Sequence, residues 1–103
     1  MNQKKLSKLR REVKAFRQKG GVKSRELESL ARAFSRELHS RGSEPNWVST
    51  VFHDLRPISI PHHGGKDLNK FTARAILDQL ENDIERFERQ ITDAYESDGD
   101  GDV

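Results

Sequence analysis

Four apolar residues near the start of the chain are separated by three, four and three positions, which places them on one face of a helix: Leu6, Leu9, Val13 and Phe16. The pair Gly20-Gly21 follows them, and paired glycines supply the left-handed geometry that stops a helix. A helix of about 16 residues is marginal alone in water. We therefore expect it to dock on the rest of the protein, to dock on a partner, or to form only when bound.

A second helix is predicted to open at Ser24, a residue type that caps helix starts. Its apolar face follows at helical spacing: Leu27, Leu30, Ala31 and Phe34. Residues 36–41 fit either a continuation of this helix through Leu38 or a short strand, and periodicity does not decide between them.

The middle of the chain has the signals of strands and turns. Residues 42–46 contain Gly and Pro and predict a turn, and residues 47–52 are rich in β-branched and aromatic side chains, which favours a strand. Ile58 and Ile60 alternate with Ser59 and predict a half-buried strand that ends at Pro61. A polar loop, residues 62–67, then leads to the last helix.

The last helix is predicted to begin near Asn69 or Lys70, with apolar positions at helical spacing: Ile76, Leu77, Leu80, Ile84, Phe87 and Ile91. Residues 96–103 are acidic and glycine-rich, so we expect a disordered tail after Tyr95. Helices, then two or three antiparallel strands, then a long helix make a small α+β layer fold.

Composition narrows the class of protein. A chain of 103 residues is expected to hold one small domain, and Leu, Ile, Val and Phe make up 24 of them, enough for a thin core. The absence of cysteine excludes disulfide and thiolate-zinc sites and fits a reducing, cytoplasmic setting. No apolar run is long enough to span a membrane. The basic N-terminus is not followed by an apolar stretch, so a secretory signal is not expected.

Charge is separated along the chain. Residues 1–25 carry ten Lys and Arg against Glu12, a net charge of +9, whereas residues 78–103 carry ten acids and two Arg, a net charge of −8. A basic segment of this density suits phosphate groups. Mutual neutralisation of the two ends, or simple solvation, explains the same pattern.

The loop at residues 62–67 and the start of the last helix hold the candidate chemistry. Gly64 and Gly65 allow close approach of a ligand, and helix N-terminal amides attract anions. Lys66 and Lys70 add positive charge, and His62 and His63 can donate to a phosphate or move protons near neutral pH. An ordinary strand-to-helix loop fits the same residues. Four histidines without close His/Asp/Glu spacing predict no metal site.

Residues 24–84 resemble the HicA family, the toxin half of bacterial HicA/HicB toxin–antitoxin pairs. The resemblance rests on three segments: Ser24-Arg25-Glu26-Leu27-Glu28-Ser29-Leu30, Arg41-Gly42-Ser43, and Ser59 to Leu68 followed by Thr72-Ala73-Arg74-Ala75-Ile76-Leu77. It implies a double-stranded-RNA-binding-like α-β-β-β-α layer fold, with residues 36–41 as its first strand. The expected division is a basic N-terminal helix (1–22), a HicA-like domain (23–95) and an acidic tail (96–103).

The resemblance also implies a function, which is metal-independent cleavage of mRNA, without a cofactor, inhibited by a HicB-type antitoxin. The catalytic candidates are His63, His62 and Glu44. The candidate RNA-binding residues are positively charged or lie in the Gly-Ser turn: Lys66, Lys70, Arg41, Ser43 and Arg74.

One departure bears on catalysis. HicA toxins similar to this chain have a catalytic His directly after the Gly-Ser turn, where this sequence has Glu44. Either another residue, such as His63, His62, His39 or Glu44, has taken the role, or the protein binds RNA without cutting it. A third hypothesis is a protein–protein adaptor that docks through the apolar faces of its first and last helices.

Overall fold

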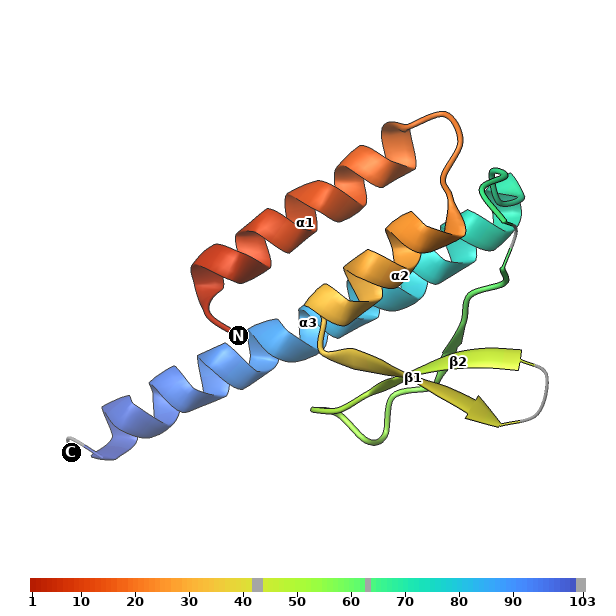
Figure 1. The fold of residues 1–103 in the computed structure, drawn as a ribbon. Helices are drawn as coiled ribbons and strands as arrows, with labels where there is room; N and C mark the ends of the chain where they lie inside the picture. The colour runs from red at the N-terminus through yellow and green to blue at the C-terminus, as the bar shows by residue number, and fades with distance from the viewer. Residues whose placement is uncertain (42–43, 63, 102–103) are drawn as a thin grey trace.

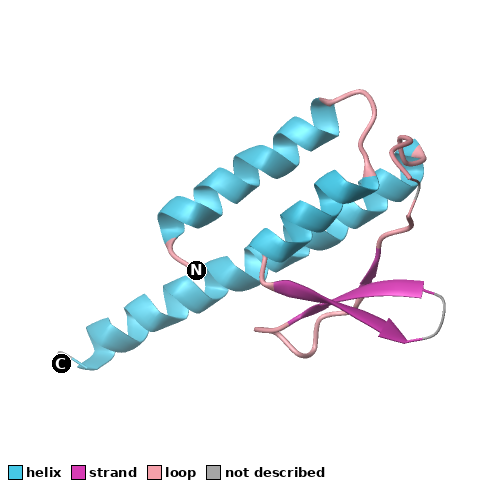
Figure 2. Cartoon of the chain, viewed as in Figure 1, coloured by secondary structure: helices cyan, strands magenta, loops and turns pink. Residues whose placement is uncertain are grey.

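A computed structural model describes residues 1–41, 44–62 and 64–101 of the chain (Figure 1). Helices α1 (Gln3–Gln18) and α2 (Ser24–Ala33) precede three strands, β1 (Arg36–Arg41), β2 (Glu44–Ser49) and β3 (Ile58–Ser59), and helix α3 (Lys70–Gly101) closes the fold. The strands form one antiparallel sheet in the order β1-β2-β3. The predicted α+β layer fold is confirmed, and Figure 2 shows the helices gathered on one side of the sheet.

Residues 36–41 form a strand, which settles the alternative that their spacing left open. Ser35, which follows the C-cap of α2, has a positive φ of 63°, and its carbonyl accepts a hydrogen bond from the Thr50 amide at 3.0 Å. β1 then pairs with β2 along its whole length, from Arg36 opposite Ser49 to Arg41 opposite Glu44. Pairing with β2 therefore decides for the strand, and the periodicity of residues 36–41 gives no information about that pairing.

The second strand begins and ends earlier than predicted. It covers Glu44–Ser49 rather than residues 47–52, and Pro45 lies inside it although we assigned it to a turn. The proline lacks an amide hydrogen, but its carbonyl still accepts from the Ile60 amide at 3.4 Å. At the other end, the Ser49 hydroxyl accepts from the amides of Val51 and Phe52, at 3.3 and 3.0 Å, and turns the chain there.

Helix α1 docks along α3 and contributes to the core. Its residues Leu6, Leu9 and Val13 are buried, and Arg17 near its end bonds to Asp78 and Glu81 near the start of α3, so the helices run antiparallel. Of the three outcomes expected for this helix, docking on the body is the one observed. The adaptor hypothesis requires this apolar face to be free for a partner, whereas its residues Leu6, Leu9 and Val13 are already buried within the fold.

The core lies between the helices and the inner face of the sheet. Its largest fully buried side chains include Trp47, Phe34 and Phe87, and Ile58 and Ile60 of the third strand region are also buried. Phe52 packs edge-to-face on Phe87, with ring centroids 4.8 Å apart. No helix in the described part of the chain is long and apolar enough to cross a membrane.

Helix α3 continues past the predicted end. Its backbone is helical to Gly101, whereas we expected disorder from residue 96. Each residue added to an existing helix gains one backbone hydrogen bond, whereas starting a new helix is unfavourable. A polar segment can therefore continue a helix that it could not start.

Candidate functional site

One end of the sheet brings together the backbone of two segments that carry candidate residues. Arg41 pairs with Glu44 where β1 and β2 meet, and the Ile60 amide bonds to the Pro45 carbonyl where the chain leaves β3 (Figure 1). In this register Glu44 lies beside the segment that leads to His62. Ser43 and His63 lie outside the described residues, as do the side chains of Arg41 and Glu44.

The loop after β3 is tied to the connection between α1 and α2. The Ser24 hydroxyl donates to the carbonyl of Pro61, and the Leu68 amide donates to the Val22 carbonyl at 2.8 Å. Ser24 is therefore a tie to this loop, not the predicted cap, and α2 is capped one residue earlier, at Lys23. Held near both ends, the loop leaves His62 and Lys66 exposed.

Both loop glycines are in the left-handed region, with φ of 52° at Gly64 and 91° at Gly65. A β-carbon at either position would meet nothing within 4 Å. The backbone therefore turns sharply here and stays open to a ligand on the outside.

The first two turns of α3 present an exposed aromatic ring and two cations. The Asn69 side chain accepts from the Phe71 amide at 2.8 Å and starts the helix. Phe71 is 75% exposed, the most exposed of the large hydrophobic residues described. Arg74 is exposed three positions after Phe71, and Lys70 is exposed four positions before Arg74, so Arg74 is the helical neighbour of both.

Sequence reasoning singled out Lys70 and Arg74 but missed Phe71. A signal was available, because Phe71 does not fall on the apolar stripe that Ile76, Leu80 and Phe87 continue. An aromatic residue off the stripe of an amphipathic helix faces solvent.

The cations of this region are not neutralised within the described part of the chain. Lys66, Lys70 and Arg74 have no ion pair there, whereas Arg17, Arg36 and Arg86 each bind a carboxylate. Lys70 and Arg74 also line a cavity of about 460 Å³ that the end of α1 and Gly20-Gly21 close from the other side. The cavity has an apolar floor that includes Leu68 and Leu77.

The remaining histidines lie elsewhere. His39 is exposed on β1, with its Nε2 atom 3.9 Å from Glu37 Oε2, and His53 is exposed in the turn after β2, beyond the opposite end of the sheet. No cluster of three His, Cys, Asp or Glu residues that could hold a metal occurs in residues 1–41, 44–62 and 64–101.

The arrangement suits an anionic, aromatic ligand. Unpaired cations attract phosphate, and an exposed ring offers a face on which a base can stack. Comparison of the chain with family models, with curated proteins and with solved structures gives no match.

Proposed function

We propose that this protein binds single-stranded RNA over the end of the sheet and the first turns of α3, and that it cleaves mRNA in the manner of a HicA toxin. The observation that carries the proposal is the exposed Phe71 next to Arg74, which in turn lies next to Lys70, and neither cation has an ion pair among the described residues. Proteins that hold single strands combine positive charge along the backbone with aromatic side chains under the bases.

The proposal draws further support from the order of the elements. The segment α2-β1-β2-β3-α3 has the α-β-β-β-α order that a double-stranded-RNA-binding-like fold requires, with α1 as an addition. In this proposal the inhibitor is a HicB-type antitoxin that covers the same surface. Its setting is the cytoplasm, in keeping with the cysteine-free composition.

Cleavage requires little from the protein. A base removes the proton of the ribose 2′-hydroxyl, the 2′-oxygen attacks phosphorus, and the bond to the 5′-oxygen breaks as that oxygen takes a proton from an acid. We assign these roles to His62 or His63 and to Glu44, whose backbone segments meet at the sheet end. Lys66 and Lys70 would stabilise the charge on the pentavalent phosphorus.

The binding surface is tested by Phe71→Ala. Loss of one stacked base costs about 1–3 kcal/mol, so the dissociation constant for RNA should rise about 5-fold to 150-fold. Fluorescence anisotropy with 2′-O-methyl RNA measures binding without cleavage. Leu38→Ala, a change at another exposed apolar residue, is the matched control and should leave the affinity unchanged. Equal affinities for the two variants would contradict the proposed surface.

Cleavage is tested by incubating purified protein with long mRNA in EDTA. The wild-type chain should produce fragments, and His62→Ala/His63→Ala should abolish them. The control His39→Ala/His53→Ala removes two histidines away from the loop and should cleave normally. Fragments that persist in the first variant would contradict the assigned roles.

A second candidate function is RNA binding without cleavage, and the specific observation in its favour is Glu44 at the position where similar toxins have a catalytic His. Binding that depends on Phe71, with no fragments from the wild-type protein, would establish this alternative.

A further inference from the structure

Six of the seven basic residues of α1 fall into two groups that differ in their partners. On the side facing α3, Arg10 pairs with Glu88, and Arg17 donates to Glu81 at 2.8 Å and to Asp78 at 2.6 Å. The bonds to these two carboxylates raise the pKa of Arg17 above its ordinary value. Part of the charge separation along the sequence is therefore neutralised where α1 meets α3.

The second group lies on the opposite side of the helix. Its members are exposed and have no ion pair among the described residues: Lys4, Lys8, Arg11 and Lys14. Their spacing of four, three and three residues keeps them on one face. Ten helical residues rise about 15 Å, so this face, which we call the α1 track, carries four cations over that length.

We propose that the α1 track binds the phosphate backbone of RNA beyond the nucleotides held at α3. The inference rests on the proposed function and extends its substrate to strands longer than the first site can cover. Four cations over 15 Å lie about 5 Å apart, which is the same order as the spacing of successive phosphates in nucleic acids, about 3.4 Å per phosphate along one strand of duplex DNA. Because the track would contact phosphates and not the edges of bases, its contribution to affinity should not depend on the RNA sequence.

The track is continuous with the first site. Gln18, on the same side of α1 as Lys14 and Arg11, lines the cavity that Lys70 and Arg74 line from α3. A strand leaving Phe71 and Arg74 can therefore pass the end of α1 and follow the track toward Lys4.

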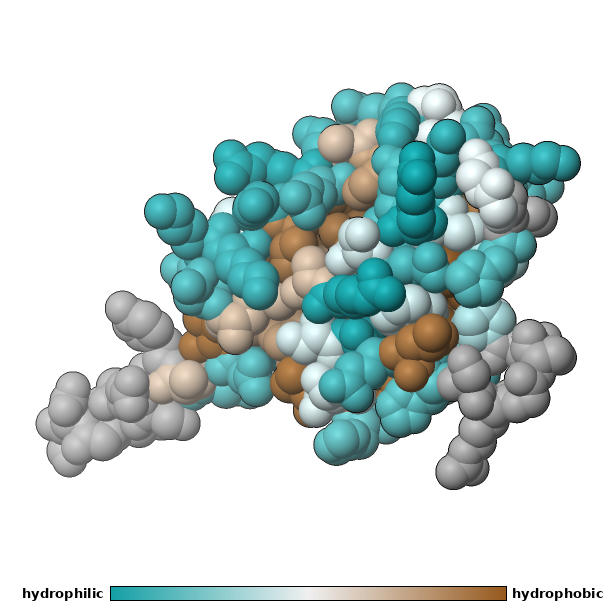
Figure 3. Space-filling model, viewed as in Figure 1, coloured by the Kyte–Doolittle hydropathy of each residue, from teal (hydrophilic) through white to brown (hydrophobic). Residues whose placement is uncertain are grey.

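A membrane surface fits the track less well. A helix that lies in a bilayer interface needs a free apolar face to insert. In α1 that face is buried, with Leu6, Leu9 and Val13 at most 4% exposed. Figure 3 shows mostly hydrophilic side chains along the outer edge of this region, and hydrophobic side chains in the crease between the helices.

The test compares Lys8→Gln/Arg11→Gln with Arg56→Gln/Arg89→Gln, which removes the same charge from exposed positions away from the track. Affinities are measured for 2′-O-methyl RNA of about 6 and about 20 nucleotides over a range of salt concentrations. The track variant should bind the long strand several-fold more weakly, with a log–log salt slope shallower by about 1.4, for two lost phosphate contacts. Its affinity for the short strand and both affinities of the control should stay at the wild-type values.

Each other outcome identifies what has failed. If the two double variants behave alike on the long strand, the α1 track is overturned while the site at α3 stands. If the wild-type protein binds neither strand, the proposed function fails and the track fails with it. If Lys8→Gln/Arg11→Gln releases the protein from phosphatidylserine vesicles without changing RNA affinity, the track serves a membrane, and the inference is overturned.

Discussion

At the scale of single residues, Gly21 shows how one backbone conformation joins two parts of the molecule. Its φ is +83°, and a β-carbon there would lie 2.4 Å from the Asp67 carboxylate oxygen Oδ2. The adjacent Val22 carbonyl accepts from the Leu68 amide, so the turn after α1 holds the loop that leads into α3. Gly20 has an ordinary φ and open space around its α-carbon.

These neighbouring glycines give a matched pair of substitutions. Gly21→Ala should lower the free energy of unfolding by about 1–2 kcal/mol, because a non-glycine residue is strained in the left-handed region. Gly20→Ala should leave stability unchanged or raise it slightly, since it restricts only the unfolded chain. Urea denaturation of the two variants measures the difference, and equal midpoints would contradict it.

At the scale of elements, the start of α2 is held to the end of α1 by one carboxylate. Glu26 accepts from the Lys23 amide at 3.1 Å, which satisfies a free donor at the helix start, and it also accepts from the Lys19 ammonium at 2.5 Å. The bond to Lys19 lowers the pKa of Glu26 most, and the bond to the Lys23 backbone lowers it further.

This contact predicts a pH dependence. Since the pKa of Glu26 is lower in the folded chain, its stabilisation is complete above the pKa of the unfolded chain and disappears as the pH falls through the folded value. Glu26→Ala should cost about 1 kcal/mol at pH 7, and the difference from wild type should vanish well below pH 4. Glu28→Ala, in the same helix, is the control. Urea midpoints measured from pH 7 to pH 2.5 check both expectations.

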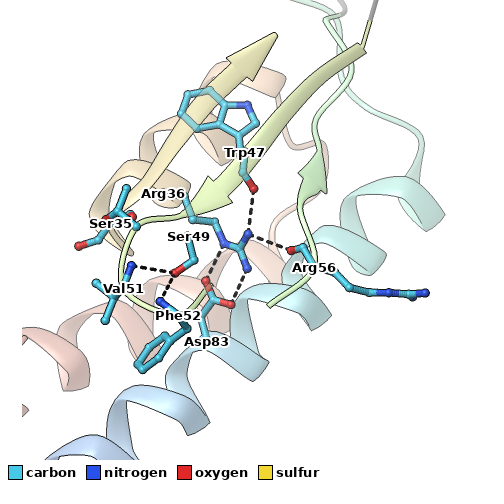
Figure 4. Close-up of polar contacts among 9 residues, drawn as sticks. Ser35, Arg36, Trp47, Ser49, Val51, Phe52, Arg56 and Asp83 are labelled. Atoms are coloured by element: carbon cyan, nitrogen blue, oxygen red, sulfur yellow. Dashed lines mark hydrogen bonds and ion pairs between the residues drawn. The ribbon is translucent and has the colours of Figure 1, made fainter. Parts of the chain in front are cut away.

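At the scale of the whole molecule, one buried ion pair joins the sheet to α3 (Figure 4). Arg36 of β1 donates through Nε and Nη2 to the two carboxylate oxygens of Asp83, at 2.7 and 2.8 Å. Its Nη1 atom donates to the carbonyls of Trp47 and Arg56, at 2.8 and 3.1 Å. Arg36 and Asp83 are 3% and 1% exposed, so the pair fixes the sheet against the helix without help from water.

Removing one partner leaves a charge buried without compensation. Asp83→Leu and Arg36→Met should each destabilise the fold by about 3–5 kcal/mol, whereas the double variant should cost less than either. Asp54→Ala, which breaks the exposed pair with Arg86, should have a much smaller effect. Equilibrium unfolding in urea gives all four values. A double variant less stable than both single variants would contradict this account.

The sequence allowed more of the helices than of the sheet to be predicted. The stripe from Leu6 to Val13 and the stripe from Ile76 to Phe87 repeat at the helical period, and a period is a local property that the chain carries in its order. Strand limits are set by pairing with another strand. Pro45 and Arg36 were therefore misplaced or left open until their partners across the sheet were known.

Some residues of the candidate site could likewise be predicted from the sequence, and others were recognised only in the structure. Residue types indicated Lys66 and Lys70, because cations suit phosphate wherever the chain places them, and the resemblance to the HicA family added Arg74. The exposure of Phe71 follows from its place off the apolar stripe, but its 75% exposed surface was recognised only in the structure.

By itself, the order of residues determined the helical faces, the separation of charge and the glycine-rich loop, since each depends on neighbours within a few positions. Only the tertiary structure decided which cations of α1 are neutralised by α3, which have no ion pair among the described residues, and which segments meet at the sheet end. The ion pairs between α1 and α3 join residues more than 60 positions apart, and the sheet-end contacts join different strands, so both depend on how the elements pack.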